Sequence, residues 1–266
     1  MYEAFYEMKY TPFTRGIPSD SLYMNAELSE VTSRLEYVAK RQLFAVLTGD
    51  CGTGKTTLLR KFKDSLDENE YKFLYVSDSK LTPRNFYRYL LTQLGFTAKY
   101  NRGDAKRQLH EEIEIMKAVH GIHPVCVCDE GHLMNREMLE EIRFLLNTRL
   151  DSESPMGLIL VGQSELWQRL KMQVNTAIRQ RIDVRSALNH YDRASTGAYI
   201  ENHLKYAGVD KDIFTDAAID AVYQYAAGTP RMIDKVCTSL LLYGAQSKKR
   251  IIDDHAVKLV LECEFD

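Results

Sequence analysis

The sequence predicts an α/β fold: a five-stranded parallel sheet with helices on both faces, followed by a small all-α domain. Three observations predict it. Short apolar segments alternate with segments of helical periodicity in the first part of the chain, which is typical of a parallel sheet. A glycine-rich turn directly follows the first apolar segment. After about residue 188, only helical patterns remain.

The elements of the sheet domain are recognised by short apolar runs and by end signals of helices. Thr82 with Pro83 and Asn135 are expected to begin helices, and Gly95 and Gly121 to end them. The expected strands are Leu43–Thr48, Phe73–Val76, Val125–Cys128, Leu158–Val161 and Ile182–Val184, and the clearest helices between them are Thr56–Leu66 and Asp104–His120.

The last part of the chain carries the signals of a helical domain. Thr215, Thr229 and Asp253 are suited to begin helices, and Gly208 and Gly228 to end them. We therefore expect one domain over residues 1–188, including a short N-terminal extension, and a helical domain over residues 189–266. Its helices are expected near Asp192–Ala207, Thr215–Ala227, Pro230–Gln246 and Asp253–Glu262.

Composition narrows the class of protein. Hydrophobic residues make up 45% of the 266 positions, enough for a packed core. The net charge is −2, so the chain as a whole is not strongly basic. DNA binding would therefore need a local basic patch or a ring of subunits. No apolar window reaches membrane-spanning length and no signal peptide is visible. With five irregularly spaced cysteines, we expect a cytoplasmic protein without a membrane part.

Residues 49–56 read Gly-Asp-Cys-Gly-Thr-Gly-Lys-Thr and match the phosphate-loop pattern G-x-x-x-x-G-K-[ST] in full. Backbone N–H groups of such a loop point at phosphate oxygens, and the following helix adds its positive end. Lys55 is expected to reach the β- and γ-phosphates of ATP, and the Thr56 hydroxyl to bind Mg²⁺. The expected nucleotide-binding residues are Gly49, Asp50, Cys51, Gly52, Thr53, Gly54, Lys55, Thr56 and Thr57.

Polar residues follow two of the other strands. Asp129 and Glu130 end the strand Val125–Cys128, at the edge where ligands bind in parallel sheets. Asp129 is expected to support Mg²⁺, and Glu130 to orient or deprotonate the attacking water. Gln163 ends the next strand and is expected to sense the γ-phosphate or the water.

Two basic positions complete the expected catalytic set. Arg181, or alternatively Arg179, is expected to reach the nucleotide of a neighbouring subunit as an arginine finger. Arg231 opens a helix of the second domain and is expected to couple the γ-phosphate to that domain. A solvated basic turn or a surface arginine is the alternative at each position.

These motifs in series resemble an AAA+ ATPase with a helical lid, and more narrowly the ExeA/GspA-type ATPases. The resemblance runs from about Tyr10 to Val260 and implies a P-loop AAA+ (ASCE) fold. Two positions depart from the pattern: Gly131 replaces the usual alanine after Asp129-Glu130, and Gln163 replaces the Asn, Ser or Thr usual in AAA+ proteins at large. The matching segments are Tyr10–Phe13, Asp129–His132, Gly162–Leu166, Gln180–Ile182 and Gly228–Arg231.

The resemblance covers several functions. Stand-alone members of this size resemble transposition helper ATPases of the TniB, TnsC and MuB type, which implies ATP-dependent assembly of a ring or filament on duplex DNA and recruitment of a DDE-type transposase. The alternative is an ExeA/GspA-type ATPase for assembly of a secretion or envelope machine. Because the chain has no room for a membrane helix or wall-binding part, the sequence favours transposition. A nucleotide-gated interaction module with negligible turnover is a third hypothesis.

DNA contacts are expected from basic residues after the second strand. They are Lys80, Arg84, Arg88 and Lys99, with Arg102 further on. The net charge requires that many weak contacts add in an assembled oligomer. A solvated helix face is the alternative for each residue.

Overall fold

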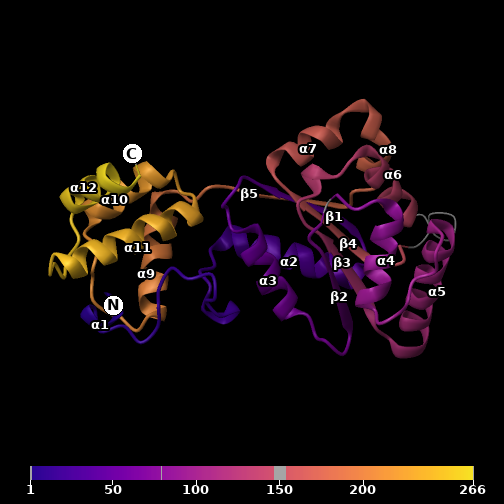
Figure 1. Ribbon diagram of the computed structural model, residues 1–266, viewed down its shortest axis with the longest axis horizontal. Helices are drawn as coiled ribbons and strands as arrows, with labels where there is room; N and C mark the ends of the chain where they lie inside the picture. The colour runs from indigo at the N-terminus through magenta and orange to yellow at the C-terminus, as the bar shows by residue number, and fades with distance from the viewer. Residues whose placement is uncertain (1, 79, 147–153, 266) are drawn as a thin grey trace. The chain divides into compact units, whose positions relative to one another are not determined.

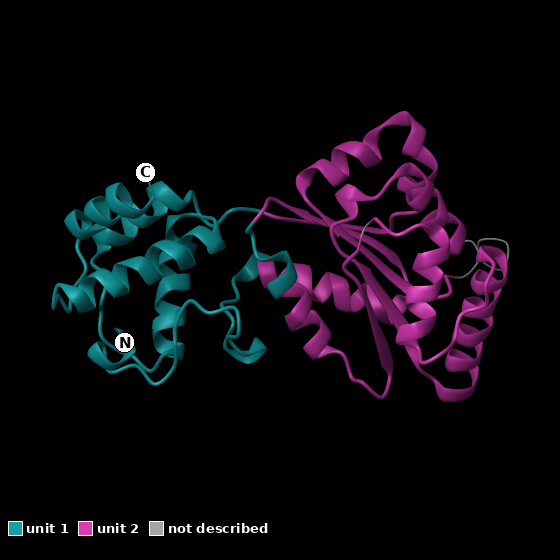
Figure 2. Ribbon diagram, viewed as in Figure 1, with its two compact units in different colours: residues 1–27, 52–57, 189–266 teal, residues 28–51, 58–188 magenta. Residues whose placement is uncertain are grey.

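The computed structural model describes residues 2–78, 80–146 and 154–265, and the chain divides into two compact units (Figures 1 and 2). The sheet unit comprises residues 28–51 and 58–188. The helical unit comprises residues 1–27, 52–57 and 189–266. Helices α2 (Ala26–Arg41) and α3 (Lys55–Ser65) each begin with residues of the helical unit and continue in the sheet unit.

The sheet unit contains a five-stranded parallel sheet in the order β2-β3-β4-β1-β5, as predicted. Strands β1 and β4 are buried along their whole length because they lie inside the sheet. All five strands end at the same edge, so the loops after β1, β3 and β4 gather there. The strands are β1 (Phe44–Gly49), β2 (Tyr71–Val76), β3 (His123–Cys128), β4 (Gly157–Gly162) and β5 (Val184–Leu188).

Both faces of this sheet are covered. Alternate residues such as Val46 and Cys126 belong to a core cluster with helices α4 to α8. Their neighbours Leu47 and Val127, which point to the opposite face, are equally buried. These helices are α4 (Pro83–Gln93), α5 (Arg102–His120), α6 (Arg136–Leu145), α7 (Ser164–Lys171) and α8 (Thr176–Arg179).

Several predicted helix ends are confirmed. The side chain of Thr82 accepts a hydrogen bond from the Asn85 amide at the start of α4. Asn135 caps α6 in the same way, through the Met138 amide. Gly121 ends α5 with φ of 67°, in the left-handed region that glycine tolerates.

The fifth strand lies later in the chain than predicted. The expected range was Ile182–Val184, whereas β5 spans Val184–Leu188. The Ile182 amide donates to the Arg179 carbonyl oxygen, so this residue still belongs to the turn after α8. Within the part of the chain that the structure describes, β5 pairs with β1 alone, and only Ser186 and Leu188 are buried along it. An edge strand with this alternation lacks the continuous apolar run that marks the inner strands.

The helical unit is built mainly from the C-terminal helices. Asp192, Thr215 and Asp253 cap three of them through side-chain oxygens. Thr229 was also expected to cap, but its hydroxyl instead lies 2.9 Å from His190 Nδ1. The helices are α9 (Arg193–Tyr206), α10 (Asp216–Ala226), α11 (Pro230–Gln246) and α12 (Asp254–Glu264), together with the short α1 (Tyr2–Phe5) and η1 (Ser19–Ser21).

Residues 1–27, predicted as an extension of the sheet domain, pack within the helical unit. The Tyr6 hydroxyl donates to the Lys249 carbonyl oxygen at 3.0 Å. The Phe13 amide donates to His203 Nδ1 at 3.1 Å, and the two rings stack. Burial lowers the pKa of His203 to about 4, so its imidazole is neutral and free to accept this bond. These side-chain contacts join segments far apart in sequence, and local patterns do not reveal them.

Among the described residues, no helix combines the length and the apolar character that crossing a membrane requires.

Candidate functional site

The loop from Gly49 to Gly54 connects the carboxyl end of β1 to α3. Gly52 and Gly54 have φ of 86° and 92°, in the region where side chains other than glycine are strained. A Cβ on Gly54 would meet nothing within 4 Å, so the backbone conformation explains this glycine. Lys55 is the first residue of α3, so its side chain stands beside the positive end of that helix. This is the geometry that a phosphate loop requires.

Gly52 also contacts the start of α11 within the helical unit. Its carbonyl oxygen accepts a hydrogen bond from the Arg231 amide at 3.3 Å. A Cβ on Gly52 would lie 2.9 Å from Thr229 Cγ2 and 3.1 Å from Arg231 Cβ, closer than normal van der Waals contact. The phosphate loop and the predicted Arg231 site therefore touch through their backbones.

The predicted carboxylates follow β3 directly. Asp129 is 5% exposed, and its Oδ2 accepts a hydrogen bond from the Tyr75 hydroxyl at 2.7 Å. Its Oδ1 accepts from the Glu130 amide at 2.8 Å. Burial raises the pKa of Tyr75, and the bond to Asp129 raises it further, so Tyr75 remains a hydrogen-bond donor. Each Asp129 oxygen keeps a second lone pair, and carboxylate with hydroxyl oxygens suits Mg²⁺.

Glu130 stands in the left-handed region with φ of 53°, which is costly for a residue with a side chain. Its side chain is 49% exposed, and its Oε2 lies 3.5 Å from Nδ1 of His132. Strained backbone at the end of an inner strand is a common feature of functional sites. Here it turns the chain directly after Asp129 into the short helix η2 (Gly131–Leu133).

Gln163 lies at the carboxyl end of β4, next to β3 in the sheet. Its backbone amide donates to His132 Nδ1 at 3.4 Å. Ser164, the following residue, donates from its hydroxyl to Asp50 Oδ1 at 2.5 Å. Hydrogen bonds within the sheet unit therefore link Gln163 to the turn after β3, and its neighbour Ser164 to the start of the phosphate loop.

The two arginine-finger candidates lie at the end of α8. The Arg179 guanidinium donates to the Lys171 carbonyl oxygen at 3.0 Å and so supports the end of α7. Arg181 follows in the turn and is half-buried. Arg179 thus supports the local fold of the sheet unit, and both arginines stay candidates for the predicted finger.

Three of the predicted DNA-contact residues line one groove of the sheet unit, and Lys80 lies outside it. Arg84, Arg88 and Lys99 line a groove of about 520 Å³ formed by α4 and residues 95–100. Tyr100, which is 78% exposed, also lines it and lies under the Arg84 guanidinium at 4.2 Å from the ring centroid. Lys80 is exposed outside this lining.

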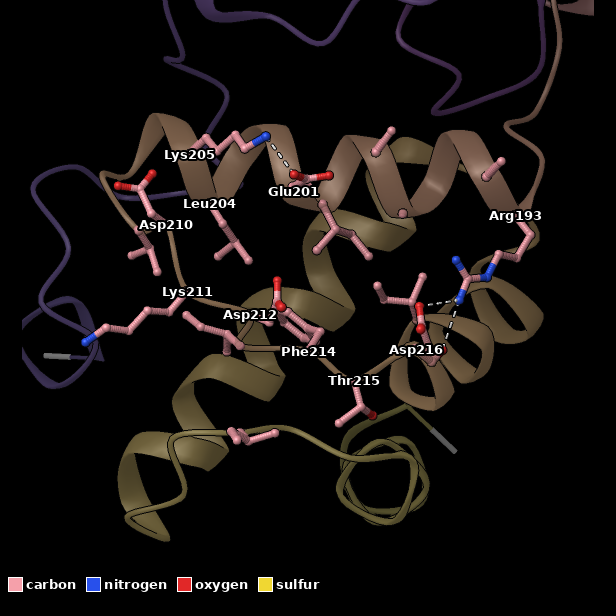
Figure 3. Close-up of a pocket in the computed structure, with 18 residues that line it drawn as sticks. Arg193, Glu201, Leu204, Lys205, Asp210, Lys211, Asp212, Phe214, Thr215 and Asp216 are labelled. Carbon is pink, nitrogen blue, oxygen red and sulfur yellow. Dashed lines mark hydrogen bonds and ion pairs between the residues drawn. The ribbon is translucent and has the colours of Figure 1, made fainter.

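A second groove, of about 740 Å³, lies in the helical unit (Figure 3). None of the predicted site residues lines it. Ion pairs stand at its ends: Lys205 with Glu201 at 2.6 Å, and Arg193 with Asp216 at 3.2 Å. At these two places, each basic side chain of the groove is therefore paired with a carboxylate.

Sequence reasoning missed three residues that support the site: Tyr75, Ser164 and Arg169. The Arg169 guanidinium, on α7, donates to the carbonyl oxygens of His132 and Met134 in the turn after Glu130. Tyr75 and Arg169 lie on ordinary elements, with no motif to single them out. Ser164 follows Gln163 within a matching segment, and its bond to Asp50 crosses 114 positions of sequence. Only the fold brings such partners together.

The family model described as an AAA domain matches residues 38–170, half of the chain. The chain belongs to the AAA domain family. The matched range begins in α2 and ends in α7, so it holds the phosphate loop, both carboxylates and Gln163.

One curated relative of this AAA domain protein is the general secretion pathway protein A of Aeromonas hydrophila. The two are 28% identical over 246 residues, which is 91% of this chain and 44% of the relative. The chain therefore spans less than half of that protein.

Solved structures share the AAA+ fold of the chain. Cdc6p from Pyrobaculum aerophilum matches with a TM-score of 0.68 at 14% identity, over 94% of this chain and 69% of that one. Drosophila ORC bound to DNA matches with a TM-score of 0.63 at 17% identity, over 98% and 64%. The RuvB branch migration motor of Thermotoga maritima matches with 0.56 at 17% identity, over 90% and 69%. At these identities the likeness shows the fold alone.

Proposed function

We propose that the chain is a Mg²⁺-dependent ATPase whose turnover drives a larger assembly. One observation carries the proposal: a complete phosphate loop leaves β1, and a buried aspartate followed by an exposed glutamate leaves β3, at the same edge of one sheet. The AAA domain match and the fold of the AAA+ neighbours support it.

The roles follow from the chemistry of each side chain. Backbone N–H groups of residues 49–57 would hold the phosphates, and Lys55 would neutralise the β- and γ-phosphates. Thr56 and Asp129 would hold Mg²⁺, which supplies charge neutralisation at the phosphates when bound. Glu130 would accept the proton of the attacking water. Gln163 would orient that water or contact the γ-phosphate.

Arg231 would couple nucleotide state to the helical unit. Its amide already binds the Gly52 carbonyl oxygen in the phosphate loop. A bound triphosphate would attract its guanidinium, because arginine forms bidentate hydrogen bonds with phosphate oxygens. Hydrolysis and loss of the γ-phosphate would release that contact.

We further propose that the chain works as a homo-oligomer, either a ring or a filament. Arg181 would enter the nucleotide site of the next subunit and stabilise charge that develops during hydrolysis. An arginine supplied by a neighbour makes turnover depend on protein concentration.

Assembly of a secretion or envelope machine is the process that we favour. The curated relative is named for the general secretion pathway, and its alignment covers 91% of the chain at 28% identity. This relative outweighs the expectation of a transposition helper, which rested on chain length and layout. A cytoplasmic location follows from an ATPase that draws on cellular ATP.

A DNA-binding role, as in a transposition regulator that acts with a DDE-type transposase on duplex DNA, is the second candidate. The groove lined by Arg84, Arg88 and Lys99 favours it, since no carboxylate is among its lining residues. Exposed Tyr100 adds an aromatic surface that suits stacking. ATP-dependent binding to duplex DNA that weakens steeply with salt, and that is lost in Arg88→Ala/Lys99→Ala, would favour this candidate. No binding at low salt with ATP and Mg²⁺ would exclude it.

The proposed ATPase activity is tested with Lys55→Ala and a matched control, Lys63→Ala, an exposed lysine on the same helix. We expect the first change to weaken binding of a fluorescent ATP analogue about tenfold or more and to abolish phosphate release. The control should retain both. Wild-type protein that releases no phosphate over a range of protein concentrations would support a nucleotide-gated module without turnover instead.

A further inference from the structure

His132 lies between two groups of the proposed catalytic site. Its Nδ1 is 3.4 Å from the Gln163 amide nitrogen, which donates to it, and 3.5 Å from Glu130 Oε2. Both distances are longer than an optimal hydrogen bond, as expected of an atom that lies between two partners. All three residues belong to the sheet unit.

One nitrogen cannot serve both partners at once. To accept from the Gln163 amide, Nδ1 must present its lone pair. To donate to the Glu130 carboxylate, it must carry a hydrogen. The two tautomers of a neutral imidazole therefore correspond to two arrangements, one that holds Gln163 and one that holds Glu130.

The ring is held firmly enough for this choice to matter. The His132 side chain is only 7% exposed. The Arg169 guanidinium donates to the carbonyl oxygens of His132 and Met134 and so fixes the turn. A Cβ on Gly162 would lie 3.0 Å from the His132 amide nitrogen, so the turn packs closely against the end of β4.

The two groups near His132 Nδ1, Glu130 and the Gln163 backbone amide, are connected to different parts of the site. Among the described residues, His132 is the side chain that contacts the Glu130 carboxylate, which is half-exposed at a strained turn. Gln163 is followed by Ser164, which bonds to Asp50 in the phosphate loop. A structural change in the phosphate loop can therefore reach the Gln163 backbone amide through the hydrogen bond between Asp50 and Ser164 and the peptide bond between Ser164 and Gln163. That backbone amide is the group that competes with Glu130 for His132 Nδ1.

We propose that His132 is a positioning residue that exchanges its Nδ1 between Gln163 and Glu130 and thereby sets the orientation of the proposed general base. When Nδ1 accepts from the Gln163 amide, Glu130 is released toward the attacking water. When Nδ1 donates to Glu130, the carboxylate is held away from it. The inference rests on the proposed ATPase function.

Two substitutions separate this role from packing. In His132→Asn, the amide group places a donor or an acceptor near the position of Nδ1. In His132→Phe, an aromatic ring remains but carries no polar atom. If the ring serves packing only, the phenylalanine variant should work and the asparagine variant should fail. The proposal predicts the opposite order.

The experiment measures kcat, KM for ATP, affinity for a fluorescent ATP analogue and melting temperature of the three proteins. We expect kcat of His132→Phe to fall about 10–100-fold, as typical for loss of an orienting partner, with analogue affinity within about twofold of wild type. His132→Asn should keep kcat within about fivefold, because its amide replaces Nδ1 as donor and acceptor.

Equal kcat in His132→Phe and wild type would overturn the proposal. So would a fall in His132→Asn as deep as in His132→Phe, at unchanged melting temperatures. Loss of analogue affinity in step with kcat would also overturn it, because the residue would then act on binding. A wild-type protein without turnover would instead remove the proposed ATPase function itself.

Discussion

Replacement of Gly131 by alanine tests the packing on which the site depends. Gly131 directly follows Asp129 and Glu130, and the ExeA/GspA-type ATPases that the sequence resembles usually have alanine at this position. In this chain a Cβ at position 131 would lie 2.5 Å from Leu160 Cδ1, 3.0 Å from Leu160 Cγ and 3.1 Å from the Val161 carbonyl oxygen. Ordinary carbon contacts are about 3.5–4.0 Å, so Leu160 must shift by about 1 Å.

The cost follows from where Leu160 lies. It is fully buried in the core cluster on β4, and because protein cores are closely packed, a displaced methyl group must press on neighbouring side chains. Overpacking of a filled core by one methyl costs about 1–3 kcal/mol. Gly103 provides the matched control, because it lies in α5 and a Cβ there would meet nothing within 4 Å. Gly103→Ala should stabilise by about 0.5–1 kcal/mol.

The assay is urea unfolding followed by tryptophan fluorescence. The chain has one tryptophan, Trp167 on α7, which packs against the core cluster of the sheet unit. Gly131→Ala should lower the midpoint and Gly103→Ala should raise it. In the background Leu160→Val, which shortens the clashing side chain, the cost of Gly131→Ala should shrink by at least about 0.5 kcal/mol. An unchanged midpoint in Gly131→Ala, or an equal cost in both backgrounds, would refute the packing argument.

Two further predictions concern single side chains. Modification of the exposed Cys51 by N-ethylmaleimide should block binding of the ATP analogue, because the adduct fills the phosphate loop. Cys51→Ser should bind the analogue normally and resist the reagent. Inhibition that persists in Cys51→Ser would point to another thiol, such as the exposed Cys263. Burial raises the pKa of Asp234 to about 6 although Tyr199 donates a hydrogen bond to it. Because this lies above the ordinary value of 3.8, folding takes up a proton and stability falls as pH rises from about 4 to 6. Asp234→Asn should therefore raise stability at pH 7.5, on the order of 1–3 kcal/mol, and much less at pH 4.5; an equal gain at both values would contradict this.

The inner part of the fold follows from the sequence because its signals are local. Strands β1, β3 and β4 each contain a short continuous apolar run, a pattern typical of buried parallel strands. The ends of α4 and α6 carry capping side chains whose chemistry acts within three residues. Helix α2 was not predicted, although its buried residues Leu28, Val31, Leu35 and Val38 keep helical spacing.

The remaining features depend on contacts between distant segments. Strand β5 is half polar because it lies at the edge of the described sheet, so its start was placed two residues too early. The packing of residues 1–27 in the helical unit depends on partners such as His203 and Lys249, about 190 to 240 positions away. The phosphate loop and Asp129-Glu130 were found as motifs, whereas the contact of His132 with Gln163 forms only when the ends of β3 and β4 lie side by side.

A single-turnover measurement on Glu130→Gln tests the central claim most directly, because the change removes the proposed base and keeps the size of the side chain. ATP bound to wild-type protein should convert to ADP on addition of Mg²⁺, whereas the variant should bind ATP with similar affinity and convert it at least about 100-fold more slowly. Conversion at the wild-type rate by Glu130→Gln would contradict the assignment of Glu130 as the base, and no conversion by the wild-type protein would contradict the account of this site as an ATPase centre.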